Sequence, residues 1–465
     1  MTVTAVGLTV TGGNGTVGTE AGGDPGVVQG VVQGGRNRER STPRRLRVGG
    51  VVAGALIAAL LAVVVTTFTI AQNAASTVTA RAATASSASD LYFALSDLDA
   101  EAARLVLLGD GTSGDGKDYS SSALSALSAY NTRNQQADTD LQQLAAGSDA
   151  AAVGQLTHAI TTYRQFAAQG VSLDQDSDSP AGESSPDAQG YYGIAATQMV
   201  TTVLPDAAAL RDTTAAQLTS AADSAHQDAL IGAIASGLLG LAALLALLVL
   251  HRRMSRWFRR VTNPGVLLAL VLVAVLAGAA AETLSSLSKD SSNAGDSFAG
   301  YLAVTRARSA AYDADAAVTR YLLAPNAIAG DPLGGGSTDN PVAQAVSAAN
   351  TAIAPLDSAD GAIAGRWQTV STVDLPKITG SAAAGDVDTA LVVDTGTARG
   401  QDAFDFYYFD TALVDLSDNR AAAFTSASTD STNELSGWTW LPWALAGAAL
   451  LALAAGIRPR LAEFR

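Results

Sequence analysis

The chain has 465 residues and no cysteine, which excludes disulfide bonds, thiol catalysis and zinc–thiolate sites. It carries 28 lysines and arginines against 43 aspartates and glutamates, a net charge of −15, and we expect no nucleic-acid partner. The charge is unevenly distributed, because basic residues gather in three short segments and acidic residues in two long ones. This pattern bears on how the chain is arranged across a membrane.

Four apolar stretches divide the chain into two matching halves. Each is close to the ~20 apolar residues that cross a bilayer as a helix, and none contains a charge. The first and third stretches start 215 residues apart, which indicates a tandem duplication. Two long polar loops, 72–228 and 282–436, separate the paired spans. The predicted spans are residues 49–71, 229–250, 264–281 and 437–457.

The remaining segments are short and basic. Residues 1–48 are rich in glycine and arginine and predict a disordered tail, 251–263 forms a basic turn, and 458–465 is a second tail. Together they hold 14 basic and 4 acidic residues, whereas the two loops carry net charges of −13 and −12. Short arginine-rich segments stay on the cytoplasmic side of a membrane. We therefore expect a multi-pass cell-membrane protein with both termini cytoplasmic and both loops outside.

The first loop is predicted to be helical throughout. A 4, 3, 4, 3 spacing of apolar residues marks the seam of a bundle helix that runs unbroken from the first span to Leu108, where glycines end it. Residues 119–146 and 149–170 predict two middle helices, 174–187 a flexible loop, and a last helix starts near Gln189. The seam residues are Leu91, Leu95, Leu98, Ala102 and Leu105, and the last helix is expected to bury Val200, Val203, Ala207, Leu210 and Thr214.

The second loop repeats this plan. A connector at 324–341 follows its first helix, and its last helix enters the fourth span. The fold class is therefore an all-α membrane protein with four transmembrane helices and two extracytoplasmic four-helix bundles in tandem. Pro205 predicts a kink in the last helix of the first bundle. The last helix of the second bundle is expected to bury Phe406, Phe409, Leu413, Leu416 and Ala423.

Candidate binding residues occupy similar positions in the two halves. Arg104 and Arg320 lie near the outer ends of the first helices, where a guanidinium could hold an amino-acid carboxylate; a surface ion pair of Arg104 with Glu101 is the simpler interpretation. The neighbouring acids Asp97, Asp99 and Glu101 are expected on solvated helix faces. Two tyrosine pairs are expected either in the bundle core or on a partner-contact surface: Tyr191, Tyr192, Tyr407 and Tyr408.

The basic turn is a candidate cytoplasmic contact. An arginine cluster beside a membrane attracts anionic lipid, and aromatic residues among arginines also suit a protein docking site. Both interpretations stay open from the sequence. The residues concerned are Arg252, Arg253, Arg256, Trp257, Phe258, Arg259 and Arg260.

Helical outer modules on paired spans resemble the ligand-binding modules of bacterial chemoreceptors. The tandem arrangement, with the sequence YYGIAATQMVTTVLPDAAALRDTTAAQL from Tyr191, is similar to the actinobacterial GlnX-like family of four-pass membrane proteins. That resemblance implies a relay of amino-acid availability from an extracytoplasmic solute-binding lipoprotein to a cytoplasmic Ser/Thr kinase. No catalytic residue carries over from it.

No pattern predicts an enzyme, a cofactor or a metal site. The three histidines are not in metal-ligand spacing, no GxSxG motif occurs, and Asp174, Asp176 and Asp178 lack the glycine and terminal glutamate of a calcium loop. The sequence therefore favours a signal-relay protein. The alternative is a non-signalling or transport-associated membrane subunit.

Overall fold

The computed structural model describes residues 36–114, 116–147, 150–258, 263–324, 333, 340–358 and 362–462. Within these ranges the chain is helical apart from short turns and two isolated bridges, which confirms the all-α prediction. Four helices are long and apolar enough to cross a membrane by length and composition. The chain is thus an all-α, multi-pass membrane protein.

Each half begins with a long helix and contains several shorter ones. The first contains α1 (Arg36–Leu108), α2 (Ser120–Gly147), α3 (Ala150–Asp176), α4 (Pro186–Gln198), the π-helical turn η1 (Met199–Val203) and α5 (Leu204–Phe258). The second contains α6 (Pro264–Leu323), α7 (Pro341–Ile353), η3 (Ala354–Ser358), α8 (Ala362–Thr369), η4 (Val370–Asp374), α9 (Leu375–Ala383), α10 (Val387–Thr395), α11 (Asp402–Leu435), η5 (Ser436–Thr439) and α12 (Leu441–Ala462).

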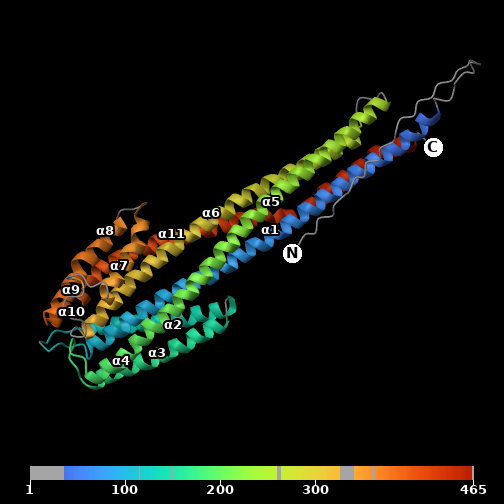
Figure 1. The fold of residues 1–465 in the computed structure, drawn as a ribbon. Helices are drawn as coiled ribbons and strands as arrows, with labels where there is room; N and C mark the ends of the chain where they lie inside the picture. Colours follow the sequence, from blue (N-terminus) through green and yellow to red (C-terminus); the bar gives the residue numbers. More distant parts are fainter. Residues whose placement is uncertain are drawn as a thin grey trace, which may run out of the picture.

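Long helices α1, α5, α6 and α11 form the axis of the molecule, and helices α2–α4 and α7–α10 gather at one end of it (Figure 1). At that end α2, α3 and α4 complete the first bundle, and α7 to α10 lie against α6 and α11 in the second. At the other end α1, α5, α6 and α12 share a core that includes Ile57, Leu247 and Val273. The outer bundles therefore stand on helices that continue into the spans.

Helix α1 confirms the predicted unbroken path to Leu108. It begins at Arg36, inside the segment 1–48 for which we expected no regular structure; residues 1–35 lie outside the described ranges. All five predicted seam residues are buried. Gly109 ends the helix with φ of 52°, and a Cβ there would lie 2.4 Å from the Ser179 carbonyl oxygen, so both conformation and space require glycine.

Helix α4 continues into α5 through the turn η1, which precedes Pro205. Proline has no N–H to close an α-helical bond, and the helix passes this point with wider π-helical bonds, the Leu204 N–H bonding to the Met199 carbonyl. A π-helical turn adds a residue and shifts the helix face. Val200 is consequently 48% exposed and our prediction that it is buried was wrong, whereas Met199 and Val203 are fully buried.

Other departures concern the loops and the last helix. Asp174 lies in the final turns of α3 rather than in a flexible loop; it is fully buried, and its Oδ1 accepts from the Ser185 N–H at 2.8 Å. Ala423 of α11 is exposed, while Phe406, Phe409 and Leu413 are buried as predicted. Most of the expected connector at 324–341 lies outside the described residues.

Candidate functional site

The two bundles are joined where α1 and α6 pack against each other. Phe93 of α1 and Tyr312 of α6 meet edge to face with ring centroids 4.8 Å apart. The guanidinium carbons of Arg308 and Arg133 lie 4.0 and 4.5 Å from the centroid of the Phe93 ring. Arg308 also donates to both carboxylate oxygens of Asp410 on α11. This aromatic contact leads outward to two buried ion pairs that cross between the halves.

The first ion pair places an arginine of the second half in the first bundle. Arg320 of α6 donates to Oδ2 of Asp99 on α1, a fully buried carboxylate. The hydroxyls of Tyr163 and Tyr192 both donate to Asp99 Oδ1 at 3.1 Å. Burial, and then the charge of Asp99, raises the pKa of each tyrosine well above its ordinary value, so both remain donors. We call these four residues the Asp99 site.

The second ion pair places an arginine of the first half in the second bundle. Arg104 of α1 donates to Asp315 Oδ2 of α6 at 3.3 Å and to Glu101 Oε1 at 3.0 Å, and its Nε lies 3.6 Å from Asp394 Oδ2 of α10. Asp402, the first residue of α11, has an oxygen within 4.8 Å of oxygens of Asp315 and Asp394. We call these five residues the Asp315 site.

The two sites occupy equivalent positions in the two halves of the sequence. Arg104 and Arg320 are 216 positions apart, as are Asp99 and Asp315. Each arginine pairs with the aspartate of the other half: Arg104 with Asp315, and Arg320 with Asp99. Such reciprocity is what a two-fold relation between duplicated units produces. The two outer bundles consequently form one body through exchanged charges, which neither half could satisfy alone.

Burial and the neighbouring charges change the pKa values of the side chains in the Asp315 site. Burial alone would lower the pKa of Arg104, but Glu101, Asp394 and Asp315 together raise it well above its ordinary value. Burial, followed by the charges of Asp315 and Asp394, raises the pKa of Asp402 well above that of a free aspartate. Burial also raises the pKa of Glu101 to about 7. Arg104 therefore stays cationic while the acids resist ionisation.

Several sequence predictions need correction here. Asp97 and Asp99 were expected on solvated faces, but they are 5% and 0% exposed, because Arg133 and Arg320 reach them from other helices. The Arg104–Glu101 pair is confirmed, yet it is largely buried and shared with the second half. The repeated spacing of aspartate and arginine, Asp99 to Arg104 and Asp315 to Arg320, was the sequence signal for this arrangement.

Of the four tyrosines in the two pairs, one is buried and three are exposed. Tyr192 belongs to the buried Asp99 site and cannot be part of an exposed contact surface. Tyr191, Tyr407 and Tyr408 are 40%, 70% and 44% exposed, and Arg366 lies over the Tyr408 ring at 3.7 Å. In the basic turn Arg252, Arg253 and Arg256 are exposed at the end of α5. The side chains of Trp257 and Phe258, and residues Arg259 and Arg260, lie outside the described part of the chain.

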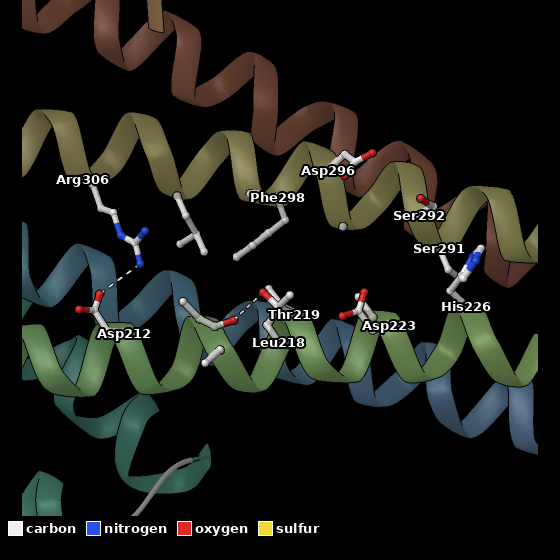
Figure 2. Close-up of a pocket in the computed structure, with 16 residues that line it drawn as sticks. Asp212, Leu218, Thr219, Asp223, His226, Ser291, Ser292, Asp296, Phe298 and Arg306 are labelled. Atoms are coloured by element: carbon white, nitrogen blue, oxygen red, sulfur yellow. Dashed lines mark hydrogen bonds and ion pairs between the residues drawn. The ribbon is translucent and has the colours of Figure 1, made fainter. Parts of the chain in front are cut away.

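A groove of about 450 Å³, lined by both polar and apolar side chains, lies between α5 and α6 (Figure 2). Figure 2 shows Arg306 of α6 reaching across to Asp212 of α5, with 3.1 Å between Nη2 and Oδ1. His226 lies toward the membrane, where its Nδ1 is 2.9 Å from the Ser288 carbonyl oxygen. Asp212, Asp223 and Arg306 are exposed, so water weakens their charges and the groove carries less electrostatic energy than the buried sites.

Comparison with known proteins identifies one part of the chain. Residues 74–223 match the family described as Actinobacterial sensor domain. No curated protein and no solved structure matches the chain. The matched residues run from the outer part of α1 to the outer part of α5 and include all of the Asp99 site except Arg320. The match supports a sensor membrane protein.

Proposed function

We propose that the protein relays extracytoplasmic amino-acid status, reported by a solute-binding lipoprotein, to a cytoplasmic Ser/Thr kinase. In this proposal the termini and the arginine-rich turn are cytoplasmic, and the chain itself catalyses no reaction. The observation that carries it is the exchange of Arg104 and Arg320 between the tips of α1 and α6. Both helices continue from these ion pairs into membrane spans.

The mechanism follows from helix rigidity. From the end of the first span to Leu108, α1 extends by roughly 55 Å at ~1.5 Å per residue. A partner that moves one bundle against the other by ~1–2 Å at the tip shifts the same helices at the membrane. The buried ion pairs favour discrete arrangements over gradual sliding, because a buried charge that loses its partner is strongly destabilised.

Partner-mediated sensing is favoured over direct amino-acid binding. Both arginines that could hold a ligand carboxylate are engaged by the protein's own acids. Exposed apolar residues on the outer faces, including Tyr191, Ile194 and Tyr407, offer contact area for a protein instead. The anionic lipid of the inner leaflet would hold the arginine-rich turn at the membrane surface beside the kinase.

The test of this proposal uses the aromatic residues of the turn. Replacing Trp257 and Phe258 with alanine, with all five arginines kept, should leave membrane levels normal. Recovery of the Ser/Thr kinase with the tagged protein should fall at least fivefold, and substrate phosphorylation should no longer follow amino-acid supply. The matched control replaces Trp440 and Trp443, aromatic residues at the opposite end of the spans, and should leave both readouts unchanged. Unchanged kinase recovery and phosphorylation in the turn variant would refute the relay to a kinase through this turn.

A further inference from the structure

The Asp315 site holds more negative than positive charge. Four carboxylates, those of Glu101, Asp315, Asp394 and Asp402, surround the single guanidinium of Arg104. Arg320 also acts on Asp315, but it is already bound to Asp99. With all four acids ionised, the site would carry a charge of about −3 in a region from which water is largely excluded. Uncompensated buried charge of this size is strongly unfavourable.

The equivalent Asp99 site has no such surplus. There one carboxylate meets one guanidinium, and the two remaining partners are the neutral hydroxyls of Tyr163 and Tyr192, both bonded to Asp99. The same inter-half ion pair is thus completed by hydrogen-bond donors in the first bundle and by acids in the second. Since the tyrosines satisfy the first pair without further charge, the extra acids of the second are not required to hold the bundles together.

The extra acids also have buried oxygens that accept no hydrogen bond within the described part of the chain. Asp402 is 1% exposed, forms no ion pair there, and its Oδ1 accepts no hydrogen bond. Neither oxygen of Asp394 accepts a hydrogen bond, and Asp394 is likewise 1% exposed. Buried carboxylate oxygens are normally satisfied by donors or by a bound cation. Among the described residues, the Arg104 Nε at 3.6 Å from Asp394 Oδ2 makes an ion pair but no hydrogen bond, and Asp402 Oδ1 has no hydrogen-bond donor.

We propose that Asp315, Asp394 and Asp402 bind one divalent cation of the oxygen-preferring class, such as Ca²⁺, Mg²⁺ or Mn²⁺. Such ions bind carboxylate oxygens at about 2.0–2.6 Å, so two ligands of one ion lie at most about 5 Å apart. One oxygen from each of the three residues lies within 4.8 Å of the others, which fits this limit. The ligands come from three helices, α6, α10 and α11. No sequence spacing could predict the site for that reason.

Cation binding would fasten the short helix α10 and the start of α11 onto α6, beside the point where Arg104 enters from the first half. The cation therefore stabilises the tip of the second bundle. This inference does not depend on the proposed relay, because it concerns the charge balance of the folded tip.

The experiment uses the full-length protein in detergent, stripped with EDTA and exchanged into chelator-free buffer at pH 7.5. Titration calorimetry and metal analysis with Ca²⁺, Mg²⁺ and Mn²⁺ should find about one equivalent of at least one ion, and that ion should raise the melting temperature by several degrees. Absence of both effects at millimolar ion would overturn the proposal and leave the acids protonated.

Variants locate the bound ion. Asp394→Asn and Asp402→Asn should each weaken binding at least tenfold, and circular dichroism would verify that they fold. Asp388→Asn, on the same helix as Asp394 but outside the cluster, should bind as the unaltered protein does. Equal binding by a folded Asp394→Asn variant and the unaltered protein would place the ion elsewhere and reject this site. Failure of the unaltered protein to bind any of the three ions would reject the site whether or not a variant folds.

Discussion

Arg320→Met should lower the melting temperature of the full-length protein by roughly 10 °C. The substitution keeps an unbranched side chain of similar length but leaves the fully buried carboxylate of Asp99 with only two tyrosine hydroxyls. Removing one partner of a buried ion pair costs about 3–5 kcal/mol, and each kcal/mol shifts the melting temperature of a domain of this size by about 2–4 °C. Differential scanning fluorimetry in detergent would measure the shift.

The double-substitution cycle separates the ion pair from general packing. Asp99→Asn should also destabilise the protein, because it leaves the guanidinium of Arg320 without its carboxylate. The double variant should lose less than the sum of the two single variants, since neither charge is then left alone. Arg164→Met provides a control at a more exposed pair, with Asp138, and should cost about 1 kcal/mol or less. Strict additivity of Arg320→Met and Asp99→Asn would show that the two residues do not interact.

The coarse architecture could be predicted because local patterns determine it. Hydrophobicity marks the four candidate spans, and the apolar repeat from Leu91 to Leu105 marks the buried face of α1. The glycines after Leu108 end that helix for a local reason, the left-handed backbone of Gly109 and Gly111. These features depend on residues within a few turns of one another, so one sequence was enough.

The candidate site could not be predicted in the same way. Whether Asp99 lies in water or in a core depends on Arg320, which is 221 positions away, and on Tyr163 and Tyr192 of two further helices. A helical projection of α1 alone therefore assigns Asp99 to the solvated side. The exposed position of Val200 was missed for a different reason, since the π-helical turn before Pro205 breaks the 3.6-residue period on which the projection rests.

Arg104→Met should destabilise the chelator-treated protein more than Arg320→Met at pH 8. Arg320 forms an ion pair with one carboxylate, that of Asp99, whereas Arg104 forms ion pairs with Glu101, Asp315 and Asp394. Its removal leaves these acids, together with Asp402, without the nearest positive charge. The loss in melting temperature should exceed roughly 10 °C, because more than one buried charge is left unpaired.

The pH dependence of this loss has a definite sign. Burial raises the folded-state pKa of Glu101 to about 7 and raises that of Asp402 well above its ordinary value, so folding favours their protonated forms. The cost of burying these acids is absent below their unfolded pKa values, near 4, and grows as the pH rises toward the folded values. Arg104 offsets that cost only where the acids are ionised. The difference in melting temperature between Arg104→Met and the unaltered protein should therefore be smaller at pH 5 than at pH 8.

Second-site substitutions identify the charges responsible. Adding Asp394→Asn or Asp402→Asn to Arg104→Met removes one unpaired acid and should recover part of the lost stability at pH 8. Asp388→Asn, which lies on α10 outside the cluster, should recover none. At pH 5 none of these three second substitutions should recover much stability, since protons already neutralise the acids there. Equal recovery by Asp388→Asn would mean that net charge, rather than the Asp315 site, controls stability, because only a local site distinguishes Asp394 from a residue two turns earlier on the same helix.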